Sequence, residues 1–209
     1  MRYQDRRDAG RRLAEALKGF ANQRVVILAL PRGGVVLGVE VARALSAPLD
    51  LVIPRKVGHP GYPEYGIAAV AEVGEVVAND AEVARVDAGW FERAVAHERA
   101  EAARRRERYL GGRPPTDLTG TTAIVVDDGI ATGLTMRAAV RDARARGAAR
   151  VVIAVPVAPA DTLAWLRREV DEVVALQAPA DYAGAVGAYY EEFGQVSDDE
   201  VVAALGDAH

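Results

Sequence analysis

The sequence predicts an α/β fold in which a mostly parallel, Rossmann-like sheet is flanked by helices. Short apolar runs, of the kind that form strands buried on both faces, alternate with segments of helical periodicity. Glycine-rich turns follow several of these runs, as they do where parallel strands lead into helices. Half of the 209 residues are hydrophobic and 27% are charged, so the chain can build one large domain, or a core with a small appendage.

The first half of the chain combines helices and strands with one irregular stretch. Leu13, Leu17 and Phe20 lie on one helical face, and the turn "PRGG" after the first apolar run opens a second helix. Residues 57–66 are rich in Gly and Pro and are too irregular for any regular element. The expected elements, in chain order, are a helix over residues 8–20, a strand over 24–30, a helix that ends at Leu45, and strands over 49–53, 67–72 and 75–77.

The second half continues the alternation and ends in an aromatic tail. Asp87 is the expected N-cap of a long helix that stops at Gly111 and Gly112. Arginines in this helix lie three or four residues from glutamates, which favours a solvated, self-paired face over a nucleic-acid surface. The expected elements are helices over 87–110, 133–146 and 160–169, strands over 123–126, 151–155 and 172–176, and short helices in the tail from about residue 180.

Composition excludes several classes of function. The net charge of -4 argues against wholesale nucleic-acid binding. The chain has no cysteine and three scattered histidines, so thiol catalysis is excluded and a zinc site is not expected. No apolar run is long enough to cross a bilayer and no signal peptide is visible, so we expect a cytoplasmic protein without membrane contact.

Lysine is scarce in this chain. Of its 26 basic residues only Lys18 and Lys56 are lysine, and Asn, Gln, Met and Cys are also rare, a bias that fits a GC-rich, thermophilic source. A lysine retained against this background marks a place where arginine would not serve. Lys56 is therefore a candidate functional residue.

The stretch "AIVVDDGIATGLTMRAAV" carries the strongest chemical signal. An apolar strand ends in two adjacent carboxylates, Asp127 and Asp128, which accept hydrogen bonds from the hydroxyls of a sugar or from magnesium-bound water. A small-residue loop then opens a helix, and its amides and hydroxyls form a cradle for a phosphate that is held and not transferred, because the loop has no lysine. The cradle comprises Gly129, Ile130, Ala131, Thr132, Gly133, Leu134 and Thr135.

The segment "IVVDDGIATGLT" resembles the phosphoribosyl pyrophosphate signature of the type I phosphoribosyltransferases. The order of the other features is similar to that family's core from residue 24 to about 176. The segments "LPRGGVVLGVEVARAL", "PRKVGHPGYPEYGIAAVAEVG" and "GQVSDDEVV" resemble a bacterial group of the family that lacks an assigned acceptor. The resemblance implies a single domain over residues 1–209, with a lid loop at 57–66 and a hood built from 87–112 and 180–209.

The resemblance also implies roles for individual residues. Asp127 and Asp128 would hold the ribose hydroxyls, and would reach Mg²⁺ indirectly through those hydroxyls, water or the diphosphate. Residues 129–135 would wrap the 5-phosphate. The resemblance places the diphosphate on Arg32 and on the amides of Gly33 and Gly34, and a non-proline cis peptide is expected at Arg32–Gly33.

Two further basic residues, Arg55 and Lys56, lie where the family has cations at the base of its lid. They would act on the negative charge that builds on the departing diphosphate. The tail aromatics have two open roles, since they would serve equally for stacking on an acceptor ring or for packing against the core. They are Tyr182, Tyr189, Tyr190 and Phe193.

The predicted function is therefore that of a Mg²⁺-dependent phosphoribosyltransferase, a glycosyltransferase of nucleotide metabolism. It would move the 5-phosphoribosyl group from phosphoribosyl pyrophosphate to a nitrogen acceptor, a nucleobase or similar small molecule, and release pyrophosphate. The main alternative is a non-catalytic regulatory protein that senses phosphoribosyl pyrophosphate on the same fold. A synthase of this donor would be a longer chain with two such halves, and a phosphatase would need a nucleophile that the sequence lacks. A homodimer is left open.

Overall fold

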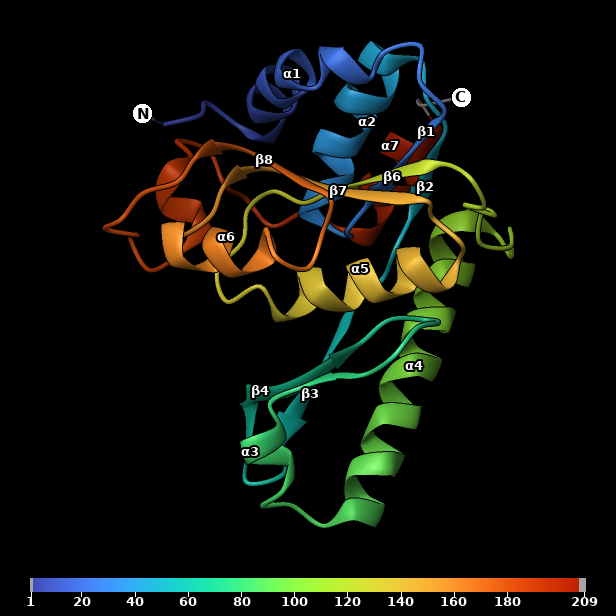
Figure 1. Cartoon of the computed structure of the whole chain (residues 1–209), viewed down its shortest axis with the longest axis vertical. Coiled ribbons are helices and arrows are strands. Elements are labelled where there is room, and N and C mark those ends of the chain that lie inside the picture. Colours follow the sequence, from blue (N-terminus) through green and yellow to red (C-terminus); the bar gives the residue numbers. More distant parts are fainter. Residues whose placement is uncertain (1, 207–209) are drawn as a thin grey trace.

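The computed structural model describes residues 2–206 and has a five-stranded, fully parallel sheet at its centre. The strand order is β2-β1-β6-β7-β8 (Figure 1). The central strands β1, β6 and β7 are buried along almost their whole length, as their continuous Val, Ile and Ala runs predict. The strands are β1 (Val25–Ala29), β2 (Leu49–Leu51), β6 (Thr122–Val126), β7 (Arg150–Val157) and β8 (Glu172–Gln177).

Helices cover both faces of this sheet. Ile27 and Ile124 face one core, which they share with Leu13 of α1 (Arg6–Ala16) and with α2 (Gly33–Leu45). The neighbouring residues Leu28 and Val125 point to the other core, under α5 (Leu134–Ala145) and α6 (Ala160–Leu166). The tail helix α7 (Asp198–Gly206) lies on the α2 side. The short helices η1 (Lys18–Phe20) and η2 (Val186–Tyr189) pack against the same core. The predicted α/β fold, a parallel sheet flanked by helices, is confirmed.

A second unit projects from the body as an arm (Figure 1). It contains an antiparallel sheet, in the order β3-β4-β5, and the long helix α4. The expected helix caps are confirmed, because the Asp87 carboxylate accepts a hydrogen bond from Trp90 N at 2.7 Å and Gly111 ends the helix in the left-handed conformation. The elements of the arm are β3 (Arg55–His59), β4 (Tyr62–Val70), β5 (Val77–Ala78), α3 (Asp80–Val83) and α4 (Ala88–Leu110).

The expectation that residues 57–66 form no regular element is wrong. Most of this stretch belongs to the β3–β4 hairpin, whose pairing shifts on either side of Gly58. A Cβ at Gly58 would lie 2.1 Å from the carbonyl oxygen of Pro63, so the glycine permits the close approach of the two strands at this irregularity. Gly and Pro, which resemble loop signals in the sequence, here mark a bulged edge hairpin.

The expectation of a self-paired arginine face on α4 holds for Arg104 but is wrong for other arginines of the helix. Arg104 pairs with Glu101 one turn earlier at 2.6 Å. Arg99 donates instead to the carbonyl oxygens of residues 71, 72 and 74, and Arg108 pairs with Asp198 of α7. Arg106 is buried and pairs with other segments. Arg99 thus holds α4 to the β4–β5 segment, Arg108 holds the tail to α4, and Arg106 holds the arm to the body, so none of the three is free for nucleic acid.

Candidate functional site

All five parallel strands end on the same side of the body, and two glycine turns meet there. A Cβ at Gly33, the first residue of α2, would lie 1.9 Å from Oδ2 of Asp128. A Cβ at Gly34 would lie 2.8 Å from the carbonyl oxygen of Val126. A larger residue at Gly34 would clash with backbone, and one at Gly33 would displace the Asp128 carboxylate. The "PRGG" turn and the acidic pair therefore lie against each other.

Asp127 lies in a crowded environment at the end of β6. Its Oδ1 accepts a hydrogen bond from the amide of Asp128 at 2.8 Å. Loss of water around the carboxyl group and the neighbouring charge of Asp128 raise the pKa of Asp127 well above its usual value. A ligand that donates hydrogen bonds here would favour the ionised carboxylate.

Asp128 has a partner that sequence analysis missed. Nε of Arg6, at the start of α1, donates to Oδ2 of Asp128 at 2.8 Å. Arg6 lies more than a hundred residues away, in a chain in which almost every basic residue is arginine, so no local pattern distinguishes it. The contact appears only once α1 is folded over the sheet.

The loop after the acidic pair leads directly into α5. Gly133 caps the helix at φ 77°, and Gly129, at φ 158°, lies under the side chain of Val186. Ala131 and Thr132 are exposed, while Thr135 is half-buried in the first turn of α5. Amides at a helix N-terminus bind anions, which suits the predicted phosphate cradle. Leu134, the first residue of α5, completes this turn.

Ile130 plays a different part in this loop. Its side chain is buried in the core under α5 and α6, and its amide donates to the carbonyl oxygen of Val157 at 2.9 Å. Since its amide is already paired, Ile130 anchors the loop to the sheet and does not contact a ligand through that group.

The "PRGG" turn contains a cis peptide bond, at Pro31–Arg32 and not at the expected Arg32–Gly33. Gly33 already belongs to α2, so the turn is confined to the residues before it. The Arg32 side chain is partly exposed, and its Nη1 lies 3.8 Å from Oδ1 of Asp198. This long, weak pair does not hold the guanidinium tightly.

Arg55 and Lys56 occupy successive positions on β3 and differ in their surroundings. Nε of Arg55 donates to Glu98 of α4 at 2.8 Å. The Lys56 side chain is exposed, and its Cδ lies 3.5 Å from the Cβ position of Gly66, a point that Leu134 of α5 approaches to 3.7 Å. The structure thus brings Lys56 toward the start of α5 and commits Arg55 to α4.

The tail covers the acidic pair from the α1 side. The buried Tyr190 donates from its hydroxyl to the carbonyl oxygen of Asp128 at 2.6 Å and packs between Tyr3 and Phe193. Tyr182 stacks on Tyr189 with ring centroids 5.5 Å apart. Tyr190 is therefore a core residue that supports the site, whereas the Tyr182–Tyr189 pair lies in a more exposed segment.

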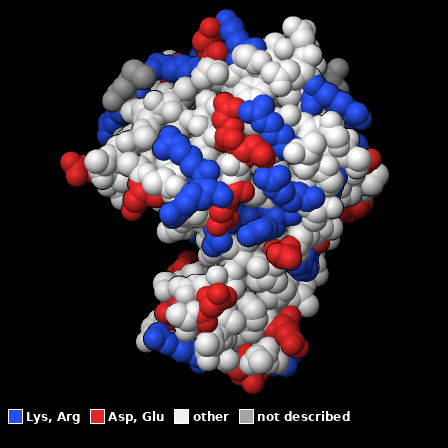
Figure 2. Space-filling view, in the orientation of Figure 1, with Lys and Arg blue, Asp and Glu red and all other residues white. Residues whose placement is uncertain are grey.

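Charges of both signs surround these elements. On the face of the body that bears α5 and α6, basic side chains gather above the arm with acidic side chains between them (Figure 2). Arg137 and Arg144 of α5 pair with Glu169 and Asp171. The intermixed signs do not form the continuous basic surface that a nucleic-acid site needs.

Two other features are absent from the described part of the chain. Residues 2–206 contain no cluster of three or more His, Cys, Asp or Glu side chains able to hold a metal ion. No helix within the same range has the length and apolar composition needed to cross a membrane.

Comparisons with known proteins agree with the geometry. Residues 3–191 match the family model described as "Phosphoribosyl transferase domain". A protein of Mycobacterium tuberculosis that carries the name "Putative phosphoribosyl transferase" is 47% identical over 209 residues, which cover 99% of this chain and 47% of that relative. The chain therefore spans about half the length of the curated relatives it matches.

Solved structures show the same architecture. The crystal structure of TT1426 from Thermus thermophilus is 46% identical, covers 99% of both chains and has a TM-score of 0.84. The AQ2163 protein from Aquifex aeolicus is 13% identical over 81% of this chain and 73% of that one, with a TM-score of 0.51. The second likeness concerns the fold alone.

Proposed function

Because the chain belongs to the phosphoribosyl transferase family, we propose that it transfers the 5-phosphoribosyl group of phosphoribosyl pyrophosphate to a nitrogen acceptor and releases pyrophosphate. The observation that carries this proposal is the contact of Gly33 with the Asp128 carboxylate. It joins a turn suited to a diphosphate with a carboxylate pair suited to a diol. The phosphate cradle follows the same pair in the chain, so groups able to bind every part of one substrate adjoin each other.

The substrate would bind across these three features. Asp127 and Asp128 would accept hydrogen bonds from the two ribose hydroxyls. The 5-phosphate would lie on the amides and hydroxyls of residues 131–135, at the positive end of α5. The diphosphate would take the Arg32 guanidinium and the amides of Gly33 and Gly34.

Magnesium fits this site through the substrate. Mg²⁺ in proteins is commonly held by one or two carboxylates together with substrate phosphates and water, and the site offers two carboxylates beside the diphosphate turn. Asp127 and Asp128 would reach the ion through ribose hydroxyls, water or the diphosphate. The bound ion would neutralise charge on the leaving diphosphate.

Lys56 and Arg55 are proposed to act on that leaving group. Lys56 is exposed on the face of the hairpin near α5, and a lysine ammonium is a compact charge that can follow a moving diphosphate. Arg55 would first have to leave Glu98, so Lys56 is the better placed of the two.

Replacing this lysine tests its role. We expect Lys56→Met to lower turnover by roughly 100-fold, because a charge aimed at the developing anion is lost, with little change in unfolding temperature. Lys18→Met is the matched control, since Lys18 is the other lysine of the chain and pairs with Glu15 on the surface of the body. Equal turnover of both variants, measured as pyrophosphate release, would remove Lys56 from the proposal.

The acceptor is open, and a screen would identify its class. Pyrophosphate release would be measured with phosphoribosyl pyrophosphate, Mg²⁺ and a library of nucleobases and amines. Release that depends on one acceptor class supports the transferase. Tight binding of the donor without release across the whole library would favour the regulatory alternative. A cytoplasmic location, a thermophilic source and a homodimer stay predictions from the sequence.

A further inference from the structure

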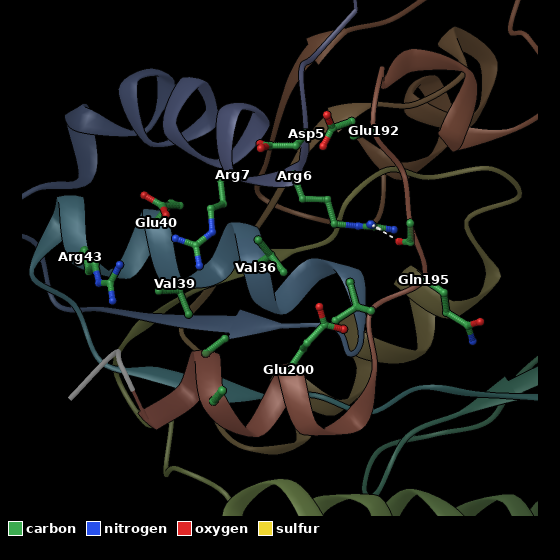
Figure 3. A pocket seen from close by; sticks show the side chains of 14 residues that line it. Asp5, Arg6, Arg7, Val36, Val39, Glu40, Arg43, Glu192, Gln195 and Glu200 are labelled. Atoms are coloured by element: carbon green, nitrogen blue, oxygen red, sulfur yellow. Dashed lines mark hydrogen bonds between the residues drawn. The ribbon is translucent and has the colours of Figure 1, made fainter.

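The Arg6 side chain joins three segments that are far apart in the sequence. Its Nε donates to Asp128, and its Nη1 donates to the carbonyl oxygen of Gly194 at 2.7 Å, as the dashed line in Figure 3 shows. The guanidinium also lies 3.8 Å from the centre of the Phe193 ring. Only 12% of the Arg6 side chain is exposed, because it packs between its own helix, the tail and the acidic pair.

Arg6 forms a wall between the acidic pair and a neighbouring cavity. The Cβ position of Gly33 lies 2.8 Å from Nε of Arg6 as well as beside Asp128, so the three groups meet at one point. On the other side Arg6 lines a cavity of about 400 Å³ between α1, α2 and α7, with Val36, Val39 and Glu200 (Figure 3). The Arg6 side chain therefore separates this cavity from the carboxylate that the substrate would use.

The hydrogen bond from Arg6 leaves Asp128 able to bind a sugar. A carboxylate offers about four acceptor positions on its two oxygens, and Arg6 Nε occupies one on Oδ2. The bond fixes the rotation of the carboxylate so that the remaining positions keep one orientation. The positive charge also offsets the repulsion between two adjacent carboxylates and a substrate that carries several phosphate charges.

We infer that Arg6 is a positioning residue of the substrate site, which orients the Asp128 carboxylate for a ribose hydroxyl and makes α1 and residues 193–194 part of that site. The inference rests on the proposed function, since it assigns Arg6 a role toward phosphoribosyl pyrophosphate. It extends the site beyond the strand-end loops to the start of α1 and to residues 193–194 of the tail.

Calorimetric titration of phosphoribosyl pyrophosphate with Mg²⁺ tests the inference. We expect Arg6→Ala to weaken binding by about 10-fold or more, because a charged hydrogen bond on Asp128 is lost. In Arg6→Lys the charge is kept, but the lysine cannot reach Asp128 and Gly194 at once. Its affinity should therefore fall between those of the wild type and Arg6→Ala. Arg11→Ala, an exposed position on the same helix, is the matched control and keeps full affinity.

Two further measurements separate positioning from a role in folding. Methylguanidinium is expected to restore part of the affinity of Arg6→Ala and to leave Arg11→Ala unchanged, which a defect in folding would not show. Thermal unfolding of each variant identifies any that do not fold, and Arg6→Lys keeps the test decisive in that case, because it retains the cation.

The outcomes distinguish this inference from the proposed function. If the wild-type protein does not bind phosphoribosyl pyrophosphate, the proposed function fails. If the wild-type protein binds it and Arg6→Ala binds as tightly as Arg11→Ala, the inference alone is wrong. Tighter binding by Arg6→Ala would also overturn it, because Arg6 would then compete with the ribose for Asp128.

Discussion

At Gly33 a side chain has to be absent for the site to exist. The position has no left-handed backbone, so the requirement comes from close approach alone. The atoms that an added methyl group would meet are the far ends of two side chains, Asp128 and Arg6, which could turn away. A larger residue at this position would therefore change the orientation of the Asp128 carboxylate more than it would lower the stability of the fold.

Gly33→Ala tests this separation of function from stability. We expect it to weaken binding of phosphoribosyl pyrophosphate by at least about 10-fold, because the Asp128 carboxylate must rotate away from its bound position. The unfolding temperature should fall little. Gly19→Ala is the control, since Gly19 lies outside the site and a Cβ there meets no atom within 4 Å. A Gly33→Ala protein that unfolds early yet binds normally would show that the glycine serves packing alone.

Asp127 carries an electrostatic cost in the unliganded protein. Burial and the charge of Asp128 raise the pKa of Asp127 in the folded protein. The stability that this carboxyl group contributes is therefore present below its unfolded pKa of about 4. It is lost as the pH rises through the pKa of the folded state. Asp127→Asn keeps an oxygen for the amide of Asp128 and removes the charge. The variant should therefore be more stable than the wild type at pH 7, by about 1 kcal/mol or roughly 2–4 °C.

Thermal unfolding without ligand, followed from pH 7 down to about pH 3, would measure this difference. The advantage of Asp127→Asn should shrink toward zero at the acid end, where the wild-type carboxyl is protonated in both states. If Asp127→Asn is as stable as the wild type at pH 7, or less stable, the Asp127 carboxylate does not destabilise the unliganded protein.

Individual residues differed in how far the sequence could predict them. The chemistry of the acidic pair and of the glycines in both turns could be predicted without a structure, because these residues form a local pattern in the sequence. Arg6 could not be found, because its role depends on the folding of α1 over the end of β6. The alternation along β3 gives Arg55 and Lys56 different neighbours, but only the packed position of α4 shows that Arg55 has a carboxylate partner.

Among the elements, α4 is tied to the body by buried charges. Arg106 donates to Asp50 of β2 at 3.0 Å, to Glu72 at 2.7 Å and to the carbonyl oxygen of Leu51 at 2.6 Å. Arg146, the residue that caps the C-terminal end of α5, pairs with the same Asp50. Burial alone would raise the pKa of Asp50, but Arg106 and the amide of Thr116 hold it below its usual value. This network fixes the arm relative to the sheet.

Removing one member of this network should be costly. We expect Arg106→Met to lower the free energy of unfolding by about 3–5 kcal/mol, because it leaves buried carboxylates without their partner. The unfolding temperature would fall by roughly 10 °C. Arg104→Met, two residues earlier on the exposed face, should change it little. Similar losses for the two variants would contradict a special role for the buried arginine.

The elements themselves follow from periodicity where they are long or fully buried. The strands of the parallel sheet and the helix from Ala88 to Leu110 needed no tertiary information, since their apolar patterns and caps are local. The β3–β4 hairpin was missed because its strand signal is interrupted by Gly58 and Pro63, whose conformations are set by pairing with each other.

For the whole molecule, the N-terminal segment meets the tail around residues 190–194 beside the carboxyl ends of the strands. Tyr3 bridges to Tyr190, and its hydroxyl donates to the carbonyl oxygen of Pro156 at 2.8 Å. The tail residues Phe193 and Gly194 then hold Arg6. Such contacts between distant segments lie beyond periodicity and motif spacing, so the sequence predicted a core and a candidate site but not the segments that enclose it.

The central claim is that this site binds phosphoribosyl pyrophosphate through its acidic pair. Titration calorimetry with the Mg²⁺ complex of the donor, on the wild-type protein and on the double variant Asp127→Asn, Asp128→Asn, tests it most directly. We predict saturable binding to the wild type and at least about 100-fold weaker binding to the double variant, since two charged hydrogen-bond acceptors are lost. No binding to the wild type, or equal binding to both proteins, would contradict the account.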